Sequence, residues 1–156
     1  VSAFLLNRSS DLLVEYVDYN LVIQWFLEQR EKYRIETIGY DPAKAFMMIQ
    51  TMQEKGFVLS EVRQGEITLT APLDNLKERF LDGNIIHNNN PMFNWYLGNV
   101  KLTKRSANGT YLPTKQSTYR KIDGFAAFLD AHTEYLRKHP LYIPEDKKLT
   151  TVINLR

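Results

Sequence analysis

The stretch IETIGYDPAKAFMMIQTMQEKGFVLSEV, residues 35–62, decides the expected fold of this chain. Its start alternates apolar and polar residues, as strands do, and Asp41-Pro42 marks a helix start because proline is favoured at the first helical position. Apolar residues then recur at helical spacing until Gly56, which stands where a left-handed end residue is expected. Residues 57–62 are rich in strand formers. The stretch therefore predicts a strand-helix-strand crossover with two parallel, neighbouring strands.

The rest of the chain adds helices and a hairpin. Residues 1–6 form an apolar run that predicts a buried strand, and Asn108-Gly109 is a strong hairpin signal between residues 100–104 and 111–115. Helices are expected after an N-cap at Asp18, from an opening Pro72 to a closing Gly83, around Met92, Trp95 and Tyr96, and from Phe125 to Leu136.

The composition is that of one globular domain. Hydrophobic residues make up 44% and charged residues 24% of the 156 residues, and no apolar stretch is long enough to cross a membrane. We expect one domain over residues 1–140 and a tail over 141–156. The net charge of +2 permits contact with phosphate without requiring it, and the absence of cysteine excludes disulfides and thiolate metal sites.

Two aspartates, Asp41 and Asp123, each stand where an apolar run meets a helix start. That placement can bring distant carboxylates together, and hard carboxylate oxygens are the ligands that Mg²⁺ prefers. The alternative is helix capping, in which each side chain contributes about 1 kcal/mol as an N-cap. The two roles are compatible, because a carboxylate can point into a cleft while its backbone begins a helix.

Basic residues gather on the expected hairpin and just before Asp123. They form the best candidate track for DNA phosphates, since phosphate contacts dominate affinity for DNA. The alternative is a solvated edge that charge protects against aggregation. The members of the track are Lys101, Lys104, Arg105, Lys115, Arg120 and Lys121.

Two other polar residues are candidates for supporting roles. Gln64 either faces the site or closes a loop with Gly65. His87 is a candidate ligand or proton carrier, although a lone histidine beside several asparagines is more often a hydrogen-bonded structural group. His132 lies on the apolar side of its helix, and a structural role is expected for it.

Several short sequence motifs, taken in their order along the chain, resemble the C-terminal nuclease domain of tailed-phage terminase large subunits of the HK97-like type. The resemblance covers residues 17–135, and each motif is weak alone. The motifs are Tyr33-Arg34-Ile35, Ile38-Gly39-Tyr40-Asp41-Pro42, Gln64-Gly65, Leu69-Thr70-Ala71-Pro72, Gly83-Asn84-Ile85-Ile86-His87, Asn90-Pro91, Trp95, Asn99-Val100, Lys115 and Lys121-Ile122-Asp123-Gly124.

This resemblance implies an α/β domain of RNase H-like fold, with a mixed β-sheet flanked by helices. It further implies an endonuclease that cuts concatemeric double-stranded viral DNA with two Mg²⁺ or Mn²⁺ ions, about 3.5–4 Å apart, that activate water and stabilise the leaving oxygen. Asp41 and Asp123 match two of the family's acidic positions and are expected to be catalytic metal ligands. Lys121, two residues before Asp123, is expected nearest the cleaved phosphate.

The resemblance has one departure. The family's first acidic ligand precedes a phrase resembling Thr-Ala-Val-Ser, and this chain starts at Val1-Ser2-Ala3, so that ligand has no counterpart in it. Asp11, Glu15 and Asp18 are the nearby acids that could substitute for it, but no motif supports them.

The expected partners follow from the same resemblance. They are viral duplex DNA, a terminase ATPase domain, the small terminase subunit and the portal protein, in the host cytoplasm and outside the mature virion. The chain has no Gly-x-x-x-x-Gly-Lys segment for cradling phosphate, so it is not expected to hydrolyse ATP itself. Two alternatives stay open: a non-catalytic DNA-binding or assembly module of the same fold, and another RNase H-like nuclease such as a resolvase.

Overall fold

A computed structural model describes residues 18–43, 46–104 and 109–140. The strand expected at residues 1–6 lies outside these ranges. The elements, in chain order, are α1 (Tyr19–Arg30), β1 (Ile38–Tyr40), α2 (Phe46–Glu54), β2 (Leu59–Glu61), α3 (Glu66–Leu81), α4 (Pro91–Gly98), β3 (Val100–Lys104), β4 (Tyr111–Lys115) and α5 (Asp123–Lys138).

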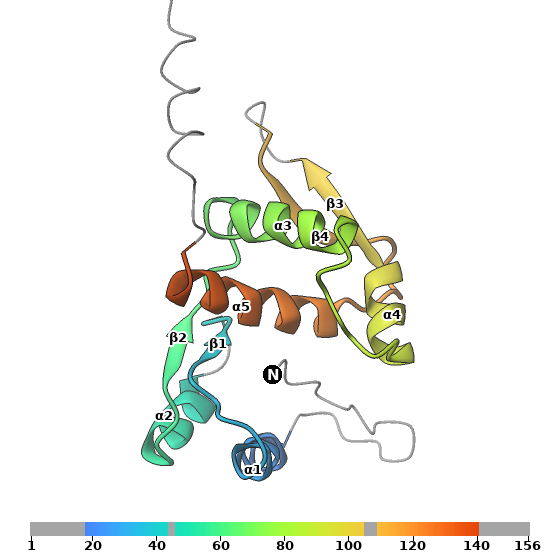
Figure 1. Cartoon of the computed structure of the whole chain (residues 1–156). Coiled ribbons are helices and arrows are strands. Elements are labelled where there is room, and N and C mark those ends of the chain that lie inside the picture. Colours follow the sequence, from blue (N-terminus) through green and yellow to red (C-terminus); the bar gives the residue numbers. More distant parts are fainter. Residues whose placement is uncertain (1–17, 44–45, 105–108, 141–156) are drawn as a thin grey trace, which may run out of the picture.

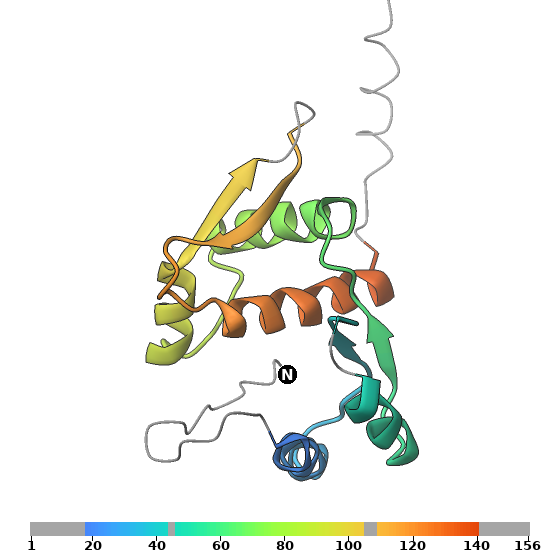
Figure 2. The ribbon, with the colours of Figure 1, turned by 180° about the vertical axis from the view of Figure 1, so that it is seen from behind.

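Helix α5 runs through the middle of the molecule. Helix α3, helix α4 and the β3–β4 hairpin lie on one side of it, and α1, α2, β1 and β2 lie on the other (Figure 1). The view from behind shows the same division (Figure 2). None of the helices in the described ranges has both the length and the apolar character that a membrane span needs.

The strand-helix-strand prediction is confirmed. Strand β1 pairs in parallel with β2, with Ile38 opposite Leu59 and Tyr40 opposite Glu61. Helix α2 connects them, and Gly56 after it has a φ of +82°, the left-handed value that glycine adopts without strain. The spacing of apolar residues and the turn-forming residues within residues 35–62 were therefore sufficient to predict this unit.

The hairpin prediction is also confirmed, but the expected single mixed sheet is not seen in the described residues. Strands β3 and β4 pair antiparallel, from Val100 opposite Lys115 to Lys104 opposite Tyr111. They form one two-stranded sheet, and β1 with β2 form another. Helices α3 and α5 lie between the two sheets, so their strands do not share an edge (Figure 1). The described fold is a mixed α/β arrangement.

Helix α3 begins earlier than predicted. Its N-cap is Gly65, so Pro72 lies inside the helix instead of opening it. A proline there removes one helical hydrogen bond. The helix continues because Leu69, Leu73 and Leu76, which share one face across the proline, are each at most 3% exposed. The burial of this stripe outweighs the local cost of the proline.

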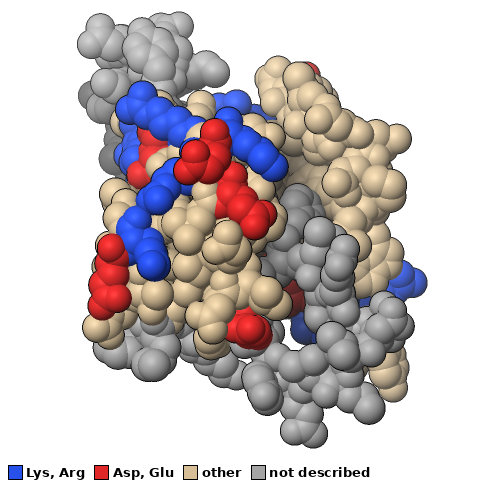
Figure 3. Space-filling view, turned by 90° about the horizontal axis from the view of Figure 1, so that it is seen from below, with Lys and Arg blue, Asp and Glu red and all other residues tan. Residues whose placement is uncertain are grey.

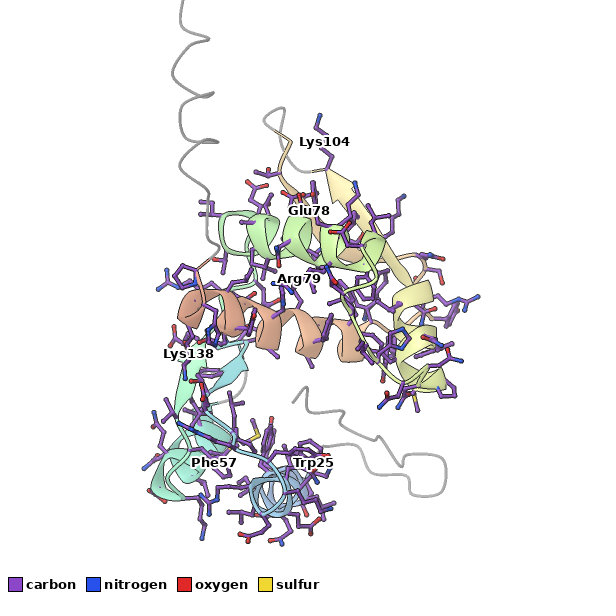
Figure 4. The ribbon with its side chains drawn as sticks, in the orientation of Figure 1. Trp25, Phe57, Glu78, Arg79, Lys104 and Lys138 are labelled. Atoms are coloured by element: carbon purple, nitrogen blue, oxygen red, sulfur yellow. The ribbon has the colours of Figure 1, made fainter. Side chains whose placement is uncertain are left out.

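Two apolar cores lie on opposite sides of α5. The first joins α3, α5 and the residue after β2, through Val62, Leu69, Leu73, Leu76, Phe125 and Leu129. The second joins α1 and α2 through Val22, Ile23, Phe26, Met52 and Phe57. Figure 4 shows Trp25 and Phe57 in this second core, where the Phe26 ring lies 5.1 Å from that of Trp25 and 6.0 Å from that of Phe57.

A buried histidine links α3 to α5. The Nε2 atom of His132 lies 2.9 Å from the Oδ1 atom of Asn75, and the same oxygen accepts a hydrogen bond from Nε of Arg79, which Figure 4 places between the two helices. Burial, and secondarily the Arg79 charge, lower the pKa of His132 to about 4. The ring is therefore neutral at physiological pH, in keeping with the structural role expected for it.

The backbones of β1 and α5 meet at Gly39. A Cβ atom at this position would lie 2.8 Å from the carbonyl oxygen of Asp130 and 3.0 Å from Cγ of Glu134. Glycine therefore lets a strand pack directly against a helix backbone.

We predict that Gly39→Ala destabilises the protein by about 1–3 kcal/mol, because the added methyl group forces the strand and the helix apart. Urea unfolding checks the value. Gly98→Ala is the matched control, since nothing lies within 4 Å of a Cβ atom there. That change should be neutral or slightly stabilising, because alanine favours helix more than glycine by about 0.5–1 kcal/mol. Equal stability of the two variants would contradict the close contact of β1 with α5.

Candidate functional site

Asp41 directly follows β1 and is exposed. Its Oδ1 atom accepts a hydrogen bond of 3.0 Å from the backbone N–H of Ala43, so it stabilises the turn that leaves the strand. The described part of α2 begins only at Phe46. Pro42 and Ala43 lie in a turn and not in the helix, so the prediction that Asp41 is the N-cap of α2 is wrong.

Asp123 is the first residue of α5, and its N-cap prediction is wrong. The N-cap position is occupied by Ile122, and no side chain makes a capping bond there. Asp123 is exposed in the first helical turn, where the helix dipole stabilises a negative charge. Its charge also reaches Tyr96: burial first, and then Asp123, raises the pKa of that phenol.

The direction of β1 relates the two aspartates. Glu36, before the strand, lies 3.6 Å from the amino group of Lys138 near the end of α5, and Gly39 lies against Asp130. The chain therefore runs antiparallel to α5 and carries Asp41 toward the helix start, where Asp123 stands. Asp41 is two residues beyond Gly39, a reach of about 7 Å in a strand. That the two carboxylates share cations stays a prediction.

Asp130 is a residue that we did not predict. It follows Asp123 by seven residues, so the two lie on nearly the same helix face, about 10 Å apart along the axis. Asp130 is 7% exposed and accepts a hydrogen bond of 2.9 Å from Nε2 of Gln64. Gln64 also donates to the carbonyl of Val62, so it connects the segment after β2 to α5. Gln64 therefore both closes its loop and faces the acidic side of the helix.

Buried Asp130 resists ionisation. Its pKa is raised to about 6: burial is the largest cause, the hydrogen bond from Gln64 lowers the pKa, and the charges of Asp41 and Glu134 raise it. The spacing of Asp123, Asp130 and Glu134 on one helix face was the signal in the sequence that could have identified this group.

An ionic contact holds the strands against α5 next to this group. Glu134 is 6% exposed and forms an ion pair with Arg137. The Nη1 atom of Arg137 donates to the hydroxyl of Ser60, at 3.1 Å, and to the carbonyl of Glu61, at 2.8 Å. Arg137 thus links the helix to β2 while it neutralises a buried acid.

A cleft of about 350 Å³ lies between β1 and α5. Its lining includes the polar side chains of Tyr40, Asp130 and Glu134. Asp41 and Asp123 do not line it. The cleft therefore does not contain the proposed ligands.

The donor chemistry of the site suits a hard divalent ion, because Asp41 and Asp123 are exposed carboxylates. Within the described ranges, no three His, Cys, Asp or Glu side chains converge as a metal-binding group. The His87 ring packs 5.3 Å from that of Phe93, and its Nδ1 atom is buried without a hydrogen-bond partner. A role for His87 as ligand or proton carrier stays a prediction.

The basic track is divided by the hairpin. Lys101, Lys104 and Lys115 are exposed, and the strand register places Lys104 and Lys115 on one face and Lys101 on the other. In Figure 4, Lys104 points away from the body of the molecule. Arg120 and Lys121 are exposed just before α5, and Arg105 lies outside the described residues. Lys101 therefore points to the opposite face of the hairpin from Lys104 and Lys115.

Charge elsewhere is less ordered. In the view of Figure 3, basic and acidic side chains of the described residues are interspersed instead of being separated by sign. This arrangement agrees with the small net charge of +2.

We predict that Asp130→Asn stabilises the protein at neutral pH. The pKa of Asp130 is raised from 3.8 to about 6, so its contribution to stability is complete below pH 3.8 and is lost as the pH rises through 6. Asparagine keeps an acceptor for Gln64 and removes the buried charge. The melting temperature of the variant should therefore exceed that of wild type near pH 7.5, by an amount equivalent to about 1–3 kcal/mol, and the gain should vanish near pH 4.

The control for Asp130→Asn is Asp74→Asn, the loss of one exposed negative charge on α3. A gain that is the same at both pH values, or that Asp74→Asn reproduces, would contradict the assignment of a buried charge to Asp130.

The chain matches known proteins at the level of family and of fold. A family model described as the terminase large subunit, endonuclease domain, matches residues 11–139. The fold is similar to that of the crystal structure of the HK97 bacteriophage large terminase, with a TM-score of 0.67 and 22% identity over 76% of this chain and 25% of that one. At this identity the likeness shows the fold alone, and the chain spans about a quarter of that terminase. No curated protein matches the chain. Because the family model covers most of its length, the chain belongs to the family of terminase large subunit endonuclease domains.

Proposed function

We propose that this domain is a metal-dependent endonuclease that cuts concatemeric double-stranded viral DNA during packaging, on an RNase H-like fold. Family membership supports nuclease activity in general. The observation that carries the finer proposal is the course of β1, which leads Asp41 along α5 toward exposed Asp123. Asp41, whose charge acts on Asp130, and Asp123 thereby come from distant parts of the chain to the same helix.

In this proposal Asp41 and Asp123 hold Mg²⁺ or Mn²⁺. When bound, two such ions supply an activated water and stabilise the leaving oxygen in phosphodiester hydrolysis. The turn bond from Ala43 restricts the side chain of Asp41, and Asp123 is exposed in the first turn of α5. Both carboxylates are thus accessible to an approaching phosphate backbone.

The basic residues hold DNA in this proposal. Lys121 is the member expected nearest the cleaved phosphate, because it stands two residues before Asp123. Lys101, Lys104, Arg105, Lys115 and Arg120 extend the contact along the backbone without reading sequence. The terminase ATPase domain, the small terminase subunit and the portal protein are the proposed partners, and the host cytoplasm is the proposed location.

The direct test is removal of each carboxylate. Asp41→Asn and Asp123→Asn in the complete protein should each reduce cleavage of plasmid DNA with Mn²⁺ by at least about 100-fold, with nearly unchanged melting temperatures because both residues are exposed. Asp74→Asn, an exposed acid on α3, is the matched control and should cut at the wild-type rate.

Full cleavage by either variant would remove that residue from the site. Wild-type protein that binds duplex DNA but never cuts it at millimolar Mn²⁺ would favour a non-catalytic binding module. A strong preference for four-way junctions over linear and supercoiled DNA would favour a resolvase-like nuclease.

We predict that Lys121→Gln weakens duplex DNA binding and reduces the slope of log affinity against log salt concentration by about 1, because one phosphate contact is lost. Fluorescence anisotropy at several salt concentrations measures both quantities. Lys77→Gln on α3 is the control for the loss of an exposed positive charge. The same reduction in both variants would mean that net charge, and not a local contact, attracts the DNA.

A further inference from the structure

Asn99, directly after α4, is a buried residue whose backbone and side chain are both hydrogen-bonded. It is 0% exposed. Its backbone N–H donates to the carbonyl of Tyr96, and its own carbonyl accepts from the N–H of Gln116, both at 3.1 Å. A buried polar group that is satisfied in this way is costly to replace, because its partners would be left without bonds.

The side chain of Asn99 reaches the segment that leads into α5. Its Nδ2 atom donates to the carbonyl of Lys121 at 2.8 Å, and its Oδ1 atom accepts from Nη1 of Arg120 at 3.3 Å. Lys121 and Arg120 immediately precede the helix that begins at Asp123. The one amide therefore holds both the backbone before Asp123 and a basic side chain of the proposed DNA track.

The same end of α4 also contacts the start of α5 through an aromatic ring. A Cβ atom at Gly124 would lie between 2.3 and 3.0 Å from three ring atoms of Tyr96, so the ring occupies the space of the missing side chain. Tyr96 and Asn99 are three residues apart. Together they contact α5 at Gly124 and the residue two positions before Asp123.

Two further hydrogen bonds stabilise the connection between the hairpin and α5. The Nε2 atom of Gln116 donates to the carbonyl of Gly98 at 2.9 Å, and the N–H of Arg120 donates to the carbonyl of Ser117 at 3.1 Å. Loss of the Asn99 side-chain amide would remove the bonds to Lys121 and Arg120. The bonds from Gln116 to Gly98 and from Arg120 to Ser117 do not involve this side chain.

We infer that Asn99 is a positioning residue, which fixes residues 116–122 and so sets the direction of the Asp123 carboxylate and of Lys121. This inference rests on the proposed function for its effect on cleavage. Its structural part concerns only the order of the segment before α5.

The test uses two buried asparagines. Asn99→Ala is compared with Asn75→Ala, because Asn75 is 8% exposed and its oxygen bonds Arg79 and His132 on α3 and α5, away from Asp123. Both variants lose a buried amide and should be destabilised to a similar degree. Hydrogen exchange of the bonded amides of Gln116 and Arg120, which donate to the carbonyls of Asn99 and Ser117, should be at least about 10-fold faster in Asn99→Ala alone.

Cleavage and metal binding provide the functional readouts. At equal folded fraction, Asn99→Ala should lower kcat with Mn²⁺ by at least about 10-fold, with KM for DNA changed less, and should weaken Mn²⁺ binding measured by titration calorimetry. Asn75→Ala should retain both. Asn99→Asp is the second variant if alanine prevents folding: it keeps the acceptor for Arg120 but replaces the donor to Lys121 with an oxygen, and it should have the same defect.

Equal exchange, kcat and Mn²⁺ affinity in the Asn99 and Asn75 variants would overturn the inference. If wild-type protein neither binds Mn²⁺ nor cuts DNA, the proposed function fails. The exchange of the Gln116 and Arg120 amides then still decides whether Asn99 holds the segment before α5.

Discussion

The contact of the β1 backbone with the α5 backbone is the constraint on which the rest of the structure depends. It requires glycine at position 39, because a side chain there would meet the carbonyl oxygen of Asp130. The close contact of Gly39 with α5 packs the parallel strands against the acidic face of the helix. Arg137 links α5 to β2 through hydrogen bonds to Ser60 and Glu61. The direction of Asp41 follows from this contact, since it lies only two residues farther along the chain.

The two sides of helix α5 differ in environment: one side is apolar and the other is acidic. One side buries Phe125 and Leu129 in the first apolar core, and the other carries Asp123, Asp130 and Glu134, of which the last two lie against Gly39 of β1. Burial of carboxylates costs free energy unless they are paired or hydrogen-bonded, and here Gln64 and Arg137 provide those partners. The raised pKa of Asp130 shows that the compensation is incomplete at neutral pH. A local free-energy cost of this kind is common at functional sites, where the position of a charged group serves the reaction instead of the stability of the fold.

The features predictable from sequence were those with local causes. The period of residues 35–62, the proline after Asp41 and the left-handed Gly56 specify a strand-helix-strand unit without reference to the remainder of the chain. The start of α3 was mispredicted because the burial of Leu69 depends on α5, which no local pattern near Pro72 reveals. Asp130 was missed for a similar reason: a single acid in an amphipathic helix is usually solvated, and only its bond to Gln64 and its position beside Gly39 show otherwise. Asn99 was identified in the sequence only as part of the motif Asn99-Val100. Its bonding role was not predicted, since its partners lie 21 and 22 residues away.

The contact of Tyr96 with Gly124 has a consequence for how this sequence can diverge. The two residues share one volume, because the ring fills the space that a side chain at position 124 would need. A larger residue at position 124 is compatible with this packing only beside a smaller one at position 96. Among related chains that keep the packing, the two positions should therefore covary as a pair, with total bulk conserved while each identity drifts.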